Sequence, residues 1–176
     1  MKKIYWDLDG VLRDLYKVTF ANRPTHWGYT ENGLDIFDVI KKDYTLLEKA
    51  PPTPFYKIAI KQPFLNILTH QPNNWVPYTE NWINKHFSSI YCKIIYVGTR
   101  NQKIDIINKE NAYLIEDCPL FDDYSRIILI DSPHNKNIKV KYRIKTPKQL
   151  EELLNLINKD LLWTRQEIEV ISINTN

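Results

Sequence analysis

Two aspartates lie two positions apart in the segment Asp7-Leu8-Asp9-Gly10, directly after the short apolar run 4–6. Residues two apart on a strand point to the same face, so both carboxylates would crowd one place at the end of that strand. A hard divalent cation such as Mg2+, which prefers oxygen ligands, would relieve the crowding. Gly10 would let the backbone turn sharply beside an anionic ligand. The alternative is a hairpin with Asp9-Gly10 in its turn, because Asp-Gly is a common turn pair.

Other polar residues also follow apolar runs, namely Thr69-His70, Lys103 and Glu116-Asp117. Each has a simpler explanation: Thr69 as a helix N-cap, Lys103 as an exposed helix residue, and the acidic pair as a solvated turn. Taken together with Asp7, they would supply a nucleophile, a hydroxyl for phosphate, a positive charge and a metal ligand. We therefore favour a shared phosphate and metal site over coincidence.

The elements that must position these residues alternate along the chain. Short runs rich in β-branched and aromatic residues predict strands at 3–8, 64–69, 92–97, 112–115 and 126–130. Helical patterns lie between or after them at 78–87, 103–109 and 147–162, the last with Thr146 as N-cap and Pro147 at the first position. The alternation predicts a parallel α/β sheet. In such sheets, ligands bind at the carboxyl ends of the strands.

One segment, residues 15–62, interrupts this alternation. It is aromatic and loop-rich, with an amphipathic patch around 34–47, and we expect a cap insertion over the carboxyl edge of a core made of residues 1–14 and 63–176. The alternative is an irregular excursion without ligand contact. Flat rings on which a nucleobase could stack, or which could instead form the insertion's own core, are Phe20, Trp27, Tyr29, Phe37, Tyr44, Phe55 and Tyr56. Arg13, Arg23 and Lys57 could meet a sugar or a second phosphate.

Composition bounds the class of protein. The 176 residues are 43% hydrophobic and 26% charged, which indicates one folded domain and argues against a disordered chain or a disulfide scaffold. A formal net charge of +3 is too small to demand a nucleic-acid or membrane partner, so we expect stable binding to neither. Cys92 and Cys118 fit no disulfide or metal pattern, and neither a secretory signal nor a long apolar run is present, so we expect a cytoplasmic protein. The tail 163–176 could be an edge strand or a homodimer contact.

At the level of motifs, the chain resembles the haloacid dehalogenase (HAD) superfamily of phosphatases. Its first motif, DxDG[TV], is similar to Asp7-Leu8-Asp9-Gly10-Val11, and its second, third and fourth motifs resemble Thr69, Lys103 and Glu116-Asp117. The resemblance covers residues 3 to about 135. It implies a HAD-like, Rossmannoid three-layer parallel sheet with a small cap insertion after the first strand.

Within that superfamily, the chain looks most like the small 5'(3')-deoxyribonucleotidases. The segment DLDGVLRD at 7–14 is similar to their DxDGVLxD opening, and IEDCP at 115–119 is similar to their IEDSP segment. The later segment 129–135 looks like their strand ending in Asp-x-Pro-x-Asn. His70 stands where that family has a small hydroxyl residue, so substrate identity is less constrained than reaction type.

The resemblance implies an enzyme, a Mg2+-dependent phosphatase acting on nucleoside 5'-monophosphates, with deoxyribonucleotides preferred. It implies that Asp7 is the nucleophile and Asp9 the general acid and base. It also implies that Asp7, the Asp9 carbonyl and Asp117 hold the metal, with Thr69 and Lys103 on the phosphate. Glu116, Asp122 and His70 are secondary candidates. The alternatives are a phosphatase acting on a nucleic-acid 3'-phosphate or a sugar phosphate, and a nucleotide-binding module without catalysis.

Overall fold

The computed structural model describes residues 2–121 and 124–159. Its centre is a six-stranded sheet in the order β3-β2-β1-β4-β5-β6, in which every neighbouring pair is parallel. The strands are β1 (Ile4–Trp6), β2 (Phe64–His70), β3 (Tyr91–Val97), β4 (Tyr113–Glu116), β5 (Ile127–Ile130) and β6 (Tyr142–Ile144). Since β1 lies between β2 and β4, the residues that follow these three strands meet at one edge of the sheet.

Seven α-helices and three short 3-10 helices connect and cover these strands within the described ranges. The α-helices are α1 (Tyr16–Thr19), α2 (Ile36–Lys42), α3 (Leu46–Lys49), α4 (Tyr56–Ala59), α5 (Val76–Phe87), α6 (Arg100–Lys109) and α7 (Pro147–Asn158). The 3-10 helices are η1 (Asn73–Trp75), η2 (Pro119–Phe121) and η3 (Pro133–Asn135). Capping boxes begin α6 at Thr99 and α7 at Thr146, as the polar residue before each apolar helix face predicts.

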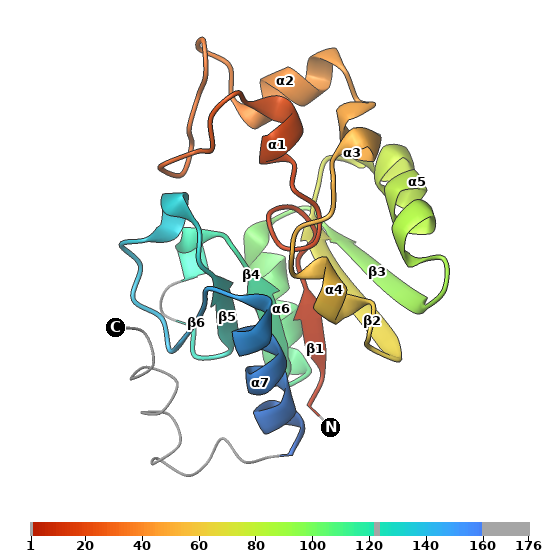
Figure 1. Ribbon diagram of the computed structural model, residues 1–176, viewed down its shortest axis with the longest axis vertical. Coiled ribbons are helices and arrows are strands. Elements are labelled where there is room, and N and C mark those ends of the chain that lie inside the picture. Colours follow the sequence, from red (N-terminus) through yellow and green to blue (C-terminus); the bar gives the residue numbers. More distant parts are fainter. Residues whose placement is uncertain (1, 122–123, 160–176) are drawn as a thin grey trace.

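Alternate strand residues pack into two different cores, one on each face of the sheet. Trp6, Ile128 and Ile130 pack with side chains of α4, α5 and α7. Tyr5 and Leu129, each next in sequence to one of these residues, pack with α6 on the opposite face. Figure 1 shows α4 and α7 on one side of the sheet and α6 on the other. The protein is therefore a layered α/β structure, as the runs that are apolar at every position predict.

The segment 15–50 forms a separate small layer beyond the carboxyl ends of the strands. Helices α1, α2 and α3 lie above the top of the sheet in Figure 1. Leu15, Ile40 and Leu47 form their own apolar cluster, which Trp75 completes from η1. Helix α4 follows this layer in sequence but packs with the main core through Ile58.

The predicted strands and helices are confirmed, and apart from the end of the last helix their boundaries agree to within three residues. Helix α7 ends at Asn158 and a turn follows at Lys159, while the predicted end, Leu162, lies outside the described residues. The tail 163–176 lies outside them as well. Strand β6 was not predicted, because it is only three residues long and lies within a lysine-rich stretch. No helix in the described part of the chain is both long and apolar enough to span a membrane.

Candidate active site

Three carboxylates from the ends of two neighbouring strands converge at the carboxyl edge of the sheet. Asp7 follows β1 directly, and its backbone N–H donates to the carbonyl of Ile115 at 2.9 Å, which extends the pairing with β4. Glu116 ends β4 and Asp117 follows it. One oxygen from each carboxylate lies within 4.8 Å of the others, and all three residues are buried. The parallel pairing of β1 with β4 thus brings together residues that are more than a hundred positions apart.

Lys103 from the first turn of α6 lies between two of these carboxylates. Its Nζ is 2.8 Å from Asp7 Oδ1 and 2.7 Å from Glu116 Oε2, and only 3% of Lys103 is exposed. The other Glu116 oxygen, Oε1, accepts hydrogen bonds from the backbone N–H groups of Asp117 and Cys118 at 3.1 and 3.2 Å. Glu116 therefore holds Lys103 and the turn after β4 in place. All three carboxylates line the same cavity, and Glu116 is the one whose second oxygen is already bound by backbone N–H groups.

The electrostatics of this cluster favour a bound cation. Three carboxylates share a single ammonium group, and buried charge without a partner is costly. Burial raises the pKa of Asp7 well above its ordinary value, helped by the negative charge of Glu116, while Lys103 opposes the rise. Burial also raises the pKa of Asp117. Burial alone would lower the pKa of Lys103, but Asp7 and Glu116 outweigh it and raise that pKa.

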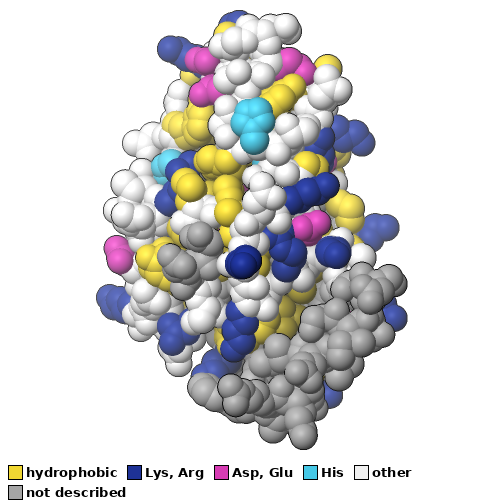
Figure 2. All heavy atoms as spheres, turned by 90° about the vertical axis from the view of Figure 1, so that its left-hand side faces the viewer, with side chains coloured by type: hydrophobic (Ala, Val, Ile, Leu, Met, Phe, Trp, Pro, Cys, Tyr) yellow, Lys and Arg dark blue, Asp and Glu magenta, His cyan; other side chains and the backbone are white. Residues whose placement is uncertain are grey.

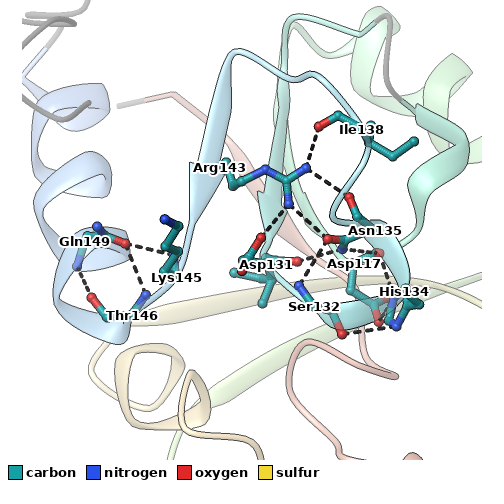
Figure 3. Close-up of polar contacts among 11 residues, drawn as sticks. Asp117, Asp131, Ser132, His134, Asn135, Ile138, Arg143, Lys145, Thr146 and Gln149 are labelled. Atoms are coloured by element: carbon teal, nitrogen blue, oxygen red, sulfur yellow. Dashed lines mark hydrogen bonds and ion pairs between the residues drawn. The ribbon is translucent and has the colours of Figure 1, made fainter. Parts of the chain in front are cut away.

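Asp117 is held by two residues of η3, as Figure 3 shows. His134 Nε2 lies 3.1 Å from the Asp117 carbonyl and 3.2 Å from Asp117 Oδ2, and Asn135 Nδ2 donates to the same carbonyl at 2.8 Å. Because a carbonyl oxygen only accepts, Nε2 must carry a proton. The other ring nitrogen, Nδ1, lies 3.1 Å from the Ser132 hydroxyl oxygen. This chain of contacts fixes the orientation of Asp117.

The residues around position 10 leave room for glycine and for no larger side chain. Its φ is +84°, and a Cβ at this position would lie 2.1 Å from Asp117 Oδ2. Any larger residue would displace the Asp117 carboxylate. Within the part of the chain that the structure describes, β1 pairs in parallel with β2 and β4 and with no antiparallel strand. The alternative of a hairpin with Asp9-Gly10 in its turn is therefore wrong.

Asp9 is held apart from the acidic cluster by a second polar network. Both of its oxygens accept hydrogen bonds from Arg13, at 2.7 and 3.2 Å, and Gln71 Nε2 donates to Asp9 Oδ2 at 2.6 Å. Thr79 Oγ1 in turn donates to Gln71 Oε1 at 2.8 Å. The guanidinium of Arg13 is buried and fully occupied in this network. The expectation that Arg13 meets a sugar or a second phosphate is therefore wrong.

The remaining candidates take different positions. Thr69 is the second-last residue of β2, has 1% of its surface exposed and is not among the residues that line the cavity next to Asp7. His70, the last residue of β2, does line that cavity and contacts the Gly98 carbonyl through Nε2 at 3.0 Å. Asp122 lies outside the described residues. Arg23 and Lys57 line a different groove on the protein surface.

A cavity of about 280 Å3 opens above the acidic cluster. Its floor includes Asp7, Lys103 and Asp117. Its walls carry four of the seven aromatic residues proposed from the sequence, which are Phe20, Trp27, Tyr29 and Phe37. The other three lie elsewhere: Tyr44 stacks on Tyr78, and Phe55 and Tyr56 pack into the main core. The insertion therefore encloses the site with flat apolar rings.

Two residues behind the site, Gln71 and His134, were not singled out from the sequence. Arg100, a cation close to a strand end in the sequence, lines the cavity and lies over the Trp27 ring at 5.2 Å from its centroid. Gln71 and His134 each follow a strand by one to four residues. A search of every strand end for polar residues, rather than for charged ones and hydroxyls alone, would have found them.

Comparison with known proteins adds no assignment: no model of a protein family matches the chain, and no curated protein matches it. The fold and the site therefore define the class by themselves. This is an α/β protein with an all-parallel six-stranded sheet and a buried acidic cluster at its carboxyl edge.

Proposed function

We propose that this protein is a Mg2+-dependent phosphatase of the haloacid dehalogenase type that hydrolyses nucleoside 5'-monophosphates. The observation that carries the proposal is the group Asp7, Lys103 and Asp117 at the floor of an enclosed cavity. A carboxylate beside a buried ammonium group and a second carboxylate is suited to attack a phosphoryl group whose charge is neutralised nearby. The motif resemblance to the 5'(3')-deoxyribonucleotidases supports the same reaction.

The residues fit Mg2+. The donors are carboxylate oxygens, which this ion prefers, and Asp7 Oδ1 is buried without a well-directed hydrogen bond. Asp7 and Asp117 would hold the ion together with the Asp9 carbonyl, while Glu116 is already engaged by Lys103 and backbone N–H groups. When bound, Mg2+ would screen the negative charges of the phosphate and the carboxylates from one another.

In the proposed reaction, Asp7 attacks phosphorus and forms an aspartyl-phosphate while the bond from phosphorus to the leaving oxygen breaks. Lys103 stabilises the negative charge on the phosphoryl oxygens. Asp9 acts as an acid only in its protonated form, which the negative charge of a neighbouring phosphate dianion would favour. In that form Asp9 gives its proton to the leaving oxygen, and it later takes one from the water that attacks the intermediate, which releases phosphate and restores both Asp7 and the protonated Asp9. Since both Asp9 oxygens accept hydrogen bonds from Arg13, Asp9 must exchange one of these partners for the leaving oxygen.

The cavity supports a nucleotide as the substrate. A planar base can stack on the rings of Phe20, Trp27 or Phe37 while its phosphate lies over Asp7, because all of these line one cavity. The cavity volume of about 280 Å3 is close to the lower end of the range found for small-molecule sites. A sugar phosphate would leave these apolar rings without a matching surface.

The test is phosphate release from nucleoside 5'-monophosphates, sugar phosphates and a 3'-phosphorylated oligonucleotide, with Mg2+ or with EDTA. Wild type is compared with Asp7→Asn and with Asp105→Asn, an exposed carboxylate on α6 that serves as the control. We expect release from nucleotides that requires Mg2+ and Asp7 and is unchanged by the control substitution. Release only from the other phosphoesters would replace the substrate, and no release from any of them would favour a binding module.

A further inference from the structure

The excess of positive over negative charge in this protein comes from one segment. Between Asp131 and Glu151 the chain has five lysines, one arginine and no acidic residue. The rest of the sequence holds 18 of the 24 basic residues and all 21 acidic residues, so without this segment it would carry a formal charge of −3. The net charge of +3 was too small to predict nucleic-acid binding. It nevertheless includes a local excess of positive charge in this segment.

All five lysines of this segment are exposed. They are Lys136, Lys139, Lys141, Lys145 and Lys148, and we call them the lysine strip. Among the described residues, only Lys148 has an ion-pair partner, Glu152 at 3.9 Å. Figure 2 shows the side of the molecule on which β6 lies, and there Lys and Arg side chains far outnumber acidic ones across the middle of the face.

Arg143, the only arginine of the segment, holds the loop between η3 and β6 in place. Arg143 donates to Asp131 Oδ1 at 2.6 Å, to Asn135 Oδ1 at 3.0 Å, and to the backbone carbonyls of Asn135 and Ile138 (Figure 3). The guanidinium thereby ties the loop after η3 to strand β6. Lys136 and Lys139 lie in this loop, Lys141 and Lys145 lie directly before and after β6, and Lys148 lies in the first turn of α7. The contacts of Arg143 therefore order the part of the backbone that carries the first lysines of the strip, which reduces the entropy lost when a ligand binds there.

A groove of about 860 Å3 adjoins the strip. Pro133 and Pro147, which lie within the basic segment, line one part of it, and the exposed cations Lys17, Arg23 and Lys57 line another. Its two acidic residues are already paired, Asp14 with Arg23 at 2.8 Å and Asp131 with Arg143 at 2.6 Å. Phe55 and Tyr56 also border it, but Phe55 is buried in the main core and the Tyr56 hydroxyl donates to the His86 carbonyl. Gly10 lines both this groove and the cavity over Asp7.

We propose that the lysine strip and the adjoining groove bind a single-stranded nucleic acid, with its phosphates along the lysines. A positively charged groove that follows the phosphate backbone is a usual feature of sites that bind single strands. An anionic membrane fits less well, because such surfaces add exposed apolar side chains to the charge. Here Ile138 and Val140 pack against one core, and Tyr142, Ile144 and Leu150 belong to the other.

This binding does not require the proposed phosphatase activity. If both proposals hold, the groove would guide a nucleic-acid strand toward the acidic cluster, since Gly10 lines both the groove and the cavity over Asp7. A terminal phosphate of that nucleic acid would then be a further substrate. The two proposals are separated by measuring binding in EDTA, where no Mg2+-dependent turnover takes place, and phosphate release in a different experiment.

The test is the fluorescence anisotropy of a labelled single-stranded oligothymidylate, titrated with the full chain in EDTA over a range of salt concentrations. The test variant replaces Lys141, Lys145 and Lys148 by Gln. The matched control replaces Lys85, Lys93 and Lys109 by Gln, which are exposed residues of α5, β3 and α6 and change the net charge equally. Strand β3 is the edge of the sheet opposite to β6.

We expect wild type and control to bind alike, and the test variant to bind at least about tenfold more weakly at low salt. The slope of log affinity against log salt should fall by roughly 2 when three phosphate contacts are lost. Equal losses in the two variants, or no binding at low salt, would overturn the proposal. Binding to vesicles of anionic lipid that exceeds binding to the oligonucleotide would also overturn it and assign the strip to a membrane surface.

Discussion

Arg13 is completely buried, and its Nε donates a hydrogen bond of 2.7 Å to Oδ1 of Asp9, four residues earlier. Nη1 of the same guanidinium donates to the carbonyl of Leu47 in α3 at 3.1 Å. One side chain therefore connects the proposed acid-base residue to the layer that covers the site. A change in the position of that layer would be transmitted directly to Asp9.

Replacing Arg13 by Met should lower both stability and turnover. The substitution removes every hydrogen bond of the guanidinium and leaves Asp9 without its cation, so we expect the free energy of unfolding to fall by about 3 kcal/mol. Urea denaturation measures this. The control is Arg23→Met, which breaks the ion pair with Asp14 on a half-exposed side chain and should cost less than about 1 kcal/mol. Equal losses in both variants would contradict the role given to Arg13.

Replacing Gly10 by Ala should abolish the response to Mg2+. The new Cβ would displace the Asp117 carboxylate, in addition to the strain of a positive φ. The increase in melting temperature that Mg2+ gives to wild type should disappear, and turnover should disappear with it. Gly33→Ala is the matched control, because Gly33 also has a positive φ, of +76°, but nothing lies within 4 Å of its added Cβ. A Mg2+ response retained in Gly10→Ala would contradict the proposed ligand role of Asp117.

The metal-free protein should lose stability as the pH rises. Because burial raises the folded-state pKa of Asp7 above its ordinary value of 3.8, the folded state keeps this proton more tightly than the unfolded state does. The resulting stabilisation is complete below the ordinary value and is lost as the pH rises through the raised pKa. Asp117 acts in the same direction. Denaturation in EDTA at a series of pH values measures this, and added Mg2+ should restore stability at neutral pH.

For the same reason, we expect the substitution Asp7→Asn to stabilise the metal-free protein rather than destabilise it. Removing one carboxylate from a cluster that has too much negative charge should raise the melting temperature in EDTA at neutral pH, although it removes the nucleophile. In Mg2+ the advantage should shrink or reverse, since a metal ligand is lost. A lower melting temperature in EDTA would show that the contact between Asp7 and Lys103 outweighs the repulsion.

Replacing His134 by Gln should weaken Mg2+ binding more than it affects folding. His134 contacts both the carbonyl and Oδ2 of Asp117, and residues that orient a metal ligand typically contribute 10- to 100-fold to the affinity, so a loss of roughly this size is expected. Isothermal titration calorimetry measures the affinity. His86→Gln on α5, away from the site, is the control and should leave it unchanged. Unchanged affinity in His134→Gln would limit His134 to a packing role.

The alternation of strands and helices was predictable because it depends on local pattern. In 127–130 every residue is apolar, and neighbouring residues pack into opposite cores, which is the arrangement expected for a strand covered on both faces. The meeting of Asp7 with Glu116 and Asp117 also followed from the sequence, because parallel strands place their carboxyl ends at one edge of the sheet.

The tertiary structure alone decided features that depend on contacts between distant residues. Arg13 looks like a surface residue in the sequence and is buried only because Leu47, 34 positions later, and Thr79 accept its hydrogen bonds. His134 reaches Asp117 across 17 positions. Strand β6 carries too few apolar residues to be distinguished from a loop, and it forms because β5 offers a free edge. Local sequence specifies which residues are buried on a strand, whereas the partners of a buried polar group depend on how the layers pack together.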